Sequence, residues 1–112
     1  MSVPTEHLLA LAAVLFAIGV AGFLTRRNLI VVLMSIELML NAANLTFVAG
    51  ARHHSMRGVI DIEGPIFAIF VIAVAAVEAA VGLALVIAFY RRKQTVSLEA
   101  VDELGEGAVG GR

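Results

Sequence analysis

Two carboxylic acids inside otherwise apolar stretches are the residues of this chain best suited to chemistry. Glu78 lies near the middle of the run 66–90, and Glu37 lies within the run 29–51. A charged side chain at the centre of a bilayer costs roughly 2.5–3.5 kcal/mol on insertion scales, so each acid is expected to face protein or water. Removal from water disfavours the ionised form of a carboxyl group. Such a group can relay protons where polar side chains or water connect it to both sides of a membrane.

Polar residues lie near Glu37 on the same predicted helix. Asn41 and Asn44 follow Glu37 at i+4 and i+7, a spacing that places all three on one helical face. On an otherwise lipid-compatible helix this face is expected to point inward, and the amides are suited to ordering water. The pattern predicts a proton relay through Glu37 and Glu78, supported by Asn41 and Asn44. A structural role, in which each acid is protonated or hydrogen-bonded and only joins helices, stays open.

The elements that must position these residues are membrane-spanning helices. The chain has 112 residues, of which 61% are hydrophobic and 15% are charged, a composition typical of membrane proteins. A helix over 66–90 would rise ~37 Å, enough to cross a hydrocarbon core of ~30 Å. We therefore predict an all-α membrane protein with three transmembrane helices at about 4–24, 29–51 and 65–90. They form one domain over 1–104, which includes a short cytoplasmic tail, and 105–112 form a flexible C-terminal tail.

Basic residues predict the orientation of these helices. One side carries five of them, in the first link and after the third helix, namely Arg26, Arg27, Arg91, Arg92 and Lys93. The other side carries Arg52 and Arg57. Because basic residues concentrate in cytoplasmic loops, the N-terminus is predicted outside and the C-terminus in the cytoplasm. This arrangement corresponds to a multi-pass protein of the cell inner (plasma) membrane.

Small residues at helical spacing predict where helices approach closely. The first helix carries such a series at Ala10, Ala13, Ala17 and Ala21, and the third carries one at Ala76, Ala80, Ala84 and Ala88. Small side chains allow close helix–helix contact within lipid. On the third helix this series lies roughly opposite Glu78, so one face is expected to pack closely while the other presents the carboxylate.

Several chemistries have no support in the sequence. Without cysteine the chain has no disulfide and no cysteine-ligated iron–sulfur cluster. It has no glycine-rich phosphate loop, and its basic residues do not form a stripe with interleaved aromatics, so no nucleic-acid partner is predicted. The adjacent His53 and His54 have no further ligands at metal spacing, so no metal site is predicted. We expect no cofactor in this chain.

Two segments give the sequence a family resemblance. The stretch 35–45, SIELMLNAANL, and the stretch 70–84, FVIAVAAVEAAVGLA, are together similar to subunit K of the proton-pumping NADH:quinone oxidoreductase, respiratory complex I. The resemblance covers roughly 5–104 and includes the basic pair Arg26 and Arg27. The sequence departs from the family at Glu63-Gly64-Pro65, where the family usually has an acid, glycine and glutamine.

The resemblance implies a function and a set of partners. It implies a non-redox subunit of a proton translocase, set in the bilayer between subunit N on one side and subunits A, J and H on the other. Glu37 and Glu78 would belong to a chain of buried charges, and Arg26 and Arg27 would match the cytoplasmic basic pair of the family. NAD, FMN, iron–sulfur clusters and quinone would be bound by partner subunits. Two alternatives stay open: a purely structural spacer, and the related C subunit of multi-subunit cation/proton antiporters.

Overall fold

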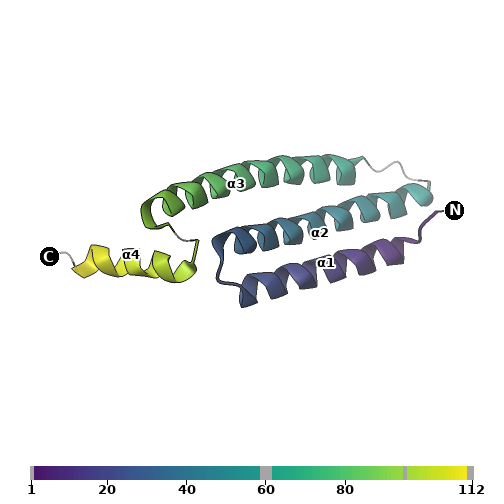
Figure 1. Cartoon of the computed structure of the whole chain (residues 1–112). Coiled ribbons are helices and arrows are strands. Elements are labelled where there is room, and N and C mark those ends of the chain that lie inside the picture. The colour runs from purple at the N-terminus through teal and green to yellow at the C-terminus, as the bar shows by residue number, and fades with distance from the viewer. Residues whose placement is uncertain (1, 59–61, 95, 111–112) are drawn as a thin grey trace.

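The described residues form three long helices and one short helix (Figure 1). The computed structural model describes residues 2–58, 62–94 and 96–110. Its helices are α1 (Thr5–Thr25), α2 (Leu29–Met56), α3 (Glu63–Lys93) and α4 (Leu98–Gly110). The first three are long and apolar enough to cross a membrane, which confirms the predicted all-α fold with three spanning helices.

The helices extend beyond the predicted ranges. α2 continues past 51 to Met56, and α3 runs from Glu63 to Lys93 instead of 65–90. The extra residues are largely polar or charged, because a helix continues into water after its apolar part has crossed the hydrocarbon. Residues 105–110 lie within α4, in the stretch where we predicted a flexible tail. This helix begins where the Ser97 hydroxyl accepts a hydrogen bond from the Glu99 N–H at 3.2 Å, as an N-cap does.

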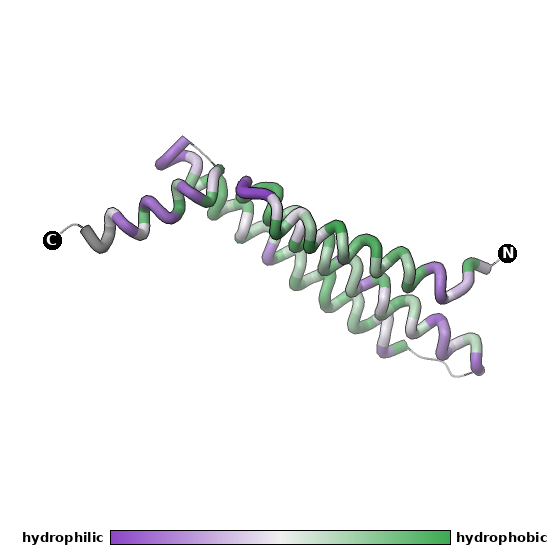
Figure 2. Tube along the Cα trace, turned by 90° about the horizontal axis from the view of Figure 1, so that it is seen from below, coloured by the Kyte–Doolittle hydropathy of each residue, from purple (hydrophilic) through white to green (hydrophobic). Residues whose placement is uncertain are grey.

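α2 lies between α1 and α3 and packs against both (Figure 1). The short link 26–28 forces α1 and α2 to run antiparallel. Asn28 is the N-cap of α2, and its Oδ1 accepts a hydrogen bond from the Ile30 N–H at 2.9 Å. Figure 2 shows apolar residues along the middle of the long helices and polar residues toward their ends and in α4. This distribution matches a bundle whose middle lies in hydrocarbon.

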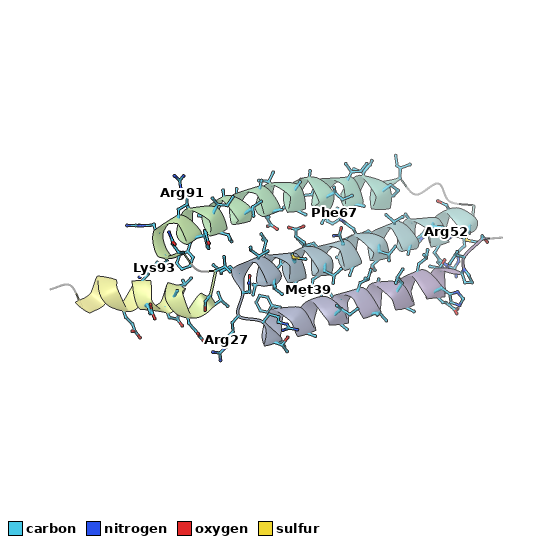
Figure 3. The ribbon with its side chains drawn as sticks, viewed as in Figure 1. Arg27, Met39, Arg52, Phe67, Arg91 and Lys93 are labelled. Carbon is cyan, nitrogen blue, oxygen red and sulfur yellow. The ribbon has the colours of Figure 1, made fainter. Side chains whose placement is uncertain are left out.

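Glycines, not the predicted alanines, bring α1 close to α2. A Cβ added at Gly19 would lie 2.6 Å from Met39 Cγ and 2.9 Å from the Ser35 carbonyl oxygen. Figure 3 shows Met39 between the two helices. Ala12 and Gly19 are buried on α1, whereas all four alanines of the predicted series, Ala10, Ala13, Ala17 and Ala21, are exposed. The alanine series therefore does not form the contact with α2, where the closest approach needs a residue with no side chain, and its close packing against another helix stays a prediction.

The contact between α2 and α3 also differs from the predicted one. A Cβ at Gly64 would lie 2.5 Å from the Ala51 Cβ, and one at Gly82 would lie 2.9 Å from Leu33 Cδ1. The buried residues of α3 are Ala68, Ala75 and Val86. The predicted series, Ala76, Ala80, Ala84 and Ala88, is exposed. By its spacing it lies on the side of α3 that is turned away from α2. No helix among the described residues covers these alanines.

The chain after α3 returns to the link between α1 and α2. α3 ends at Lys93, and the residue that caps it, Gln94, has a left-handed backbone with φ 55°. The Leu29 N–H then donates to the Val96 carbonyl at 2.8 Å, and the Leu98 N–H donates to the Arg27 carbonyl at 3.0 Å. The Arg27 guanidinium also pairs with the Glu99 carboxylate. These contacts join the start of α4 to the start of α2.

The contact at Gly19 can be tested by a matched pair of substitutions. Gly19→Ala should destabilise the protein by about 1–3 kcal/mol, because the new methyl group meets Met39 and the Ser35 backbone. Gly50→Ala is the control, since a Cβ there has no neighbour within 4 Å. It should be neutral, or stabilising by up to about 1 kcal/mol. The measurement is thermal unfolding of the protein purified in detergent from its own membrane; equal effects of the two substitutions would contradict the assigned packing.

The predicted orientation can be tested with single cysteines, because the chain has none of its own. Ser55→Cys lies near the end of α2, and Gln94→Cys lies at the opposite end of the bundle, after α3. A membrane-impermeant thiol reagent added to intact cells should label Ser55→Cys and leave Gln94→Cys unlabelled. Inverted membrane vesicles should give the opposite result. The reverse pattern in both preparations would show that the orientation is wrong.

Candidate functional site

Glu37 lies in a groove between α2 and α3. It is half-buried, and it lines a groove of about 430 Å³ together with Asn41 of the same helix and Ala79 and Leu83 of α3. Leu33, one turn earlier on α2, contacts Gly82, so this side of α2 faces α3. The Oε1 atom of Glu37 is buried and has no hydrogen-bond partner among the described residues. The side chain is thus held away from water without a donor from its own chain.

The two asparagines continue this polar side of α2. Glu37 and Asn41 line the same groove, as their spacing predicted. Asn44 is only 8% exposed, and its Oδ1 is likewise buried without a partner in the described part of the chain. A buried acceptor left without a hydrogen bond costs roughly 1–3 kcal/mol. Two such atoms on one face of one helix mark a place where donors from outside this chain, such as water, are needed.

Glu78 has a different environment. It is exposed on the described surface of α3, and it is not among the residues that line the groove, although its neighbour Ala79 is. No hydrogen bond or ion pair joins it to Glu37 within the ranges described. The expectation that Glu78 faces protein is therefore not met by this chain alone. Because an acid at mid-span is costly in lipid, its surroundings must come from another chain.

Arg26 and Arg27, the basic pair of the first link, have different surroundings. The Arg27 guanidinium pairs with Glu99 of α4, and both side chains are mostly exposed to solvent. An exposed pair of this kind contributes about 0–1 kcal/mol, so its main effect is on where the tail lies. Arg26 has no ion-pair partner in the part of the chain that the structure describes, and its side chain is exposed. It is the member of the pair that is open to a contact outside the chain.

A second polar groove, which we did not predict, lies at the far end of the same two helices. A groove of about 360 Å³ is lined by Thr46 and His54 of α2 and by Glu63 and Gly64 of α3. Phe47 and Phe67 also line it, with ring centroids 4.8 Å apart. A signal existed in the spacing, since Phe47 and Ala51 follow Asn44 at i+3 and i+7. No group of three His, Asp or Glu side chains in the described ranges is placed to hold a metal ion.

Comparison with known proteins gives a consistent result over nearly the whole chain. Residues 7–106 match the family model of NADH-ubiquinone/plastoquinone oxidoreductase chain 4L. NADH-quinone oxidoreductase subunit K of Sorangium cellulosum (strain So ce56) is 60% identical over 104 residues, which is 93% of this chain and 97% of the relative. Subunit K of Anaeromyxobacter sp. (strain K) is 54% identical over 103 residues, 92% of this chain and 99% of the relative. Subunit K of Myxococcus xanthus (strain DK1622) is 60% identical over 97 residues, 87% and 92% of the two chains.

Proposed function

Because the chain belongs to the NADH-ubiquinone/plastoquinone oxidoreductase chain 4L family, we propose that it helps translocate protons during quinone reduction, through membrane glutamates. Its family and its three spanning helices make it a multi-pass membrane subunit of an NADH-quinone oxidoreductase. The observation that supports the proton role is the position of Glu37, half-buried between α2 and α3 beside Asn41. A carboxyl group in that place can hold a proton and pass it on.

The redox chemistry is proposed for other subunits. This chain has no cysteine to hold an iron–sulfur cluster and no glycine-rich loop for a dinucleotide. NAD, FMN, iron–sulfur clusters and quinone would accordingly be bound by partner subunits. The contribution of this chain to the translocase is then to hold and move protons in the membrane, which requires only side chains and water. The membrane is proposed to be the cell inner (plasma) membrane.

The position of Glu78 supports a role at a boundary between subunits. Glu78 is exposed on α3, and the series Ala76, Ala80, Ala84 and Ala88 on that helix is exposed as well. Small residues let a neighbouring helix approach, and the acid needs cover from lipid. We assign these surfaces to the membrane subunits N, J, A and H of the same complex. In this arrangement Glu37 and Glu78 exchange protons through groups or water supplied by a neighbour.

Arg26 supports the same arrangement at the predicted cytoplasmic end. Its guanidinium is exposed, whereas Arg27 is engaged by Glu99. Arg26 is therefore proposed to contact a partner subunit or to assist proton entry, and Arg27 to hold the tail.

A structural spacer is the second candidate, because no contact within the described residues joins the two acids. In that case the carboxyl groups only join helices and never change protonation. The antiporter C subunit is less well supported, because the relatives at 54–60% identity over nearly the full chain are named subunit K of NADH-quinone oxidoreductase.

Replacement of the acids by glutamine separates the relay from the spacer. Glutamine keeps the shape and hydrogen bonding of the side chain but cannot titrate. Glu37→Gln should reduce coupled electron transfer and proton pumping on the order of tenfold or more, since loss of a proton-transferring group typically costs that much. Glu78→Gln should have a smaller effect, because neighbouring subunits can supply other routes. The measurement is NADH-driven quinone reduction and proton uptake in inverted membrane vesicles.

The control for these variants is Glu6→Gln. Glu6 lies exposed in the first turn of α1, and its replacement should leave both activities unchanged. Normal pumping in Glu37→Gln, Glu78→Gln and the double variant, with the complex fully assembled, would reject the relay and favour the spacer.

A further inference from the structure

We propose that the contact between α2 and α3 contains a water path from Glu37 to the groove at His54 and Glu63, and that the Phe47–Phe67 ring pair closes it. This inference rests on the proposed proton role of Glu37 and adds a route and a gate to it. The path binds water molecules, and it conducts protons.

The first observation is that the relevant residues lie on one side of α2. Leu33 contacts Gly82, Phe47 contacts Phe67, and Ala51 contacts Gly64, so this side faces α3 along its whole length. Glu37 and Asn44 fall on the same side, because they occur at i+4 and i+11 from Leu33. The path therefore needs no crossing from one helix face to another.

The second observation is the pair of buried acceptors. Oε1 of Glu37 and Oδ1 of Asn44 are both buried without partners among the described residues, and Asn44 is 92% buried. The two residues are seven positions apart, which is a rise of ~10.5 Å along the helix axis and more than one hydrogen bond spans. A chain of about three waters, at the usual oxygen–oxygen separation of ~2.8 Å, would connect them. Asn41 lines the groove between them and offers further hydrogen bonds to such water.

The third observation is the aromatic contact just beyond Asn44. Phe47 lies ~4.5 Å further along the helix axis, and its ring centroid is 4.8 Å from that of Phe67. Figure 3 shows Phe67 between α3 and α2. Two rings in contact offer water no hydrogen bonds, so they separate the buried acceptors from the groove beyond them. Phe47 is 40% exposed and Phe67 49%, so neither ring is enclosed by the side chains of this chain.

Beyond the rings the lining becomes polar again. The groove of about 360 Å³ contains the hydroxyl of Thr46 and the titratable side chains of His54 and Glu63. His54 is exposed, so this groove connects with the water at that end of the bundle. When the rings part, the O–H bond of protonated Glu37 breaks, an O–H bond forms on the adjacent water, and an excess proton is passed on to His54 or Glu63. Atoms and charge balance without a further reactant.

The path can be tested by the reactivity of a cysteine placed at its buried end. Asn44→Cys is made in the complete complex, and labelling of this chain is followed by mass spectrometry, since the chain has no native cysteine. The probe is a small charged methanethiosulfonate, which reacts with thiolate in water. With Phe47 present the reaction should be slow. In the Phe47→Ala background it should be at least tenfold faster, and Phe47→Leu, which keeps an apolar bulk, should restore slow labelling.

Phe70→Ala is the matched control. The ring centroids of Phe70 and Phe67 are 6.4 Å apart, but the Phe70 side chain does not line the groove. Its truncation to alanine should therefore leave the labelling rate unchanged. Equal rates with and without Phe47 would overturn the gate. Slow labelling in every background would overturn the path. If Phe47→Ala speeds the labelling as expected but Glu37→Gln still pumps protons normally, the path is supported and only the proton relay through Glu37 is rejected.

A second measurement keeps Asn44 in place, in case Asn44→Cys does not assemble. The complex with Phe47→Ala is reconstituted in liposomes, and the passive proton leak is measured without NADH. The leak should rise several-fold over that of the unchanged complex and should fall back when Asn44→Leu is added, because leucine offers the water no hydrogen bond. A leak that does not change with Phe47→Ala would overturn the proposal.

Discussion

The structure depends on α2, which packs against α1 on one side and α3 on the other and must keep its polar side chains out of lipid. Toward α1 it presents Ser35 and Met39 against the backbone of Gly19. The hydroxyl groups on α2 are satisfied by the helix itself: Ser35 Oγ donates to the Val31 carbonyl at 2.7 Å, and Thr46 Oγ1 donates to the Ala42 carbonyl at 3.1 Å. A hydroxyl group can donate to the carbonyl one turn earlier, whereas Oε1 of Glu37 and Oδ1 of Asn44 are acceptors, and the backbone N–H groups near them are already used inside the helix. Glu37 and Asn44 therefore require partners across the α2–α3 contact.

This difference between the two faces explains why polar chemistry gathers on one side of the bundle. The α1 contact is close, built on glycine, and leaves no orphan polar atom among the described residues. The α3 contact is close at Gly64 and Gly82 but is grooved between them, where Glu37 and Asn41 lie. A small three-helix chain cannot enclose such a groove completely. In the proposed arrangement, the remaining cover and the surroundings of Glu78 come from the neighbouring subunits of the oxidoreductase.

The link 26–28 and the start of α4 fix the end of the bundle that carries most of the basic residues. Backbone hydrogen bonds between Leu29 and Val96 and between Leu98 and Arg27 place the tail against the N-terminus of α2. Val101 of α4 then reaches a separate apolar groove of about 400 Å³ between α2 and α3, beside Leu29 and Phe89. The tail is thus tied to the helix that carries Glu37, and Arg26 is left exposed beside it.

The sequence by itself determined the spans, the polar side of α2 and the family, because apolar length and helical period are properties of local sequence. It did not determine which face meets which neighbour. Alanine series on α1 and α3 had the right period for close packing, yet glycines made the contacts, since the approach of two helices is decided by the closest pair of atoms across them. Only the tertiary structure separated Glu37, held between helices, from Glu78, left on the outside. It also brought Phe47 to Phe67, because these residues are distant in sequence and meet only when α2 and α3 pack.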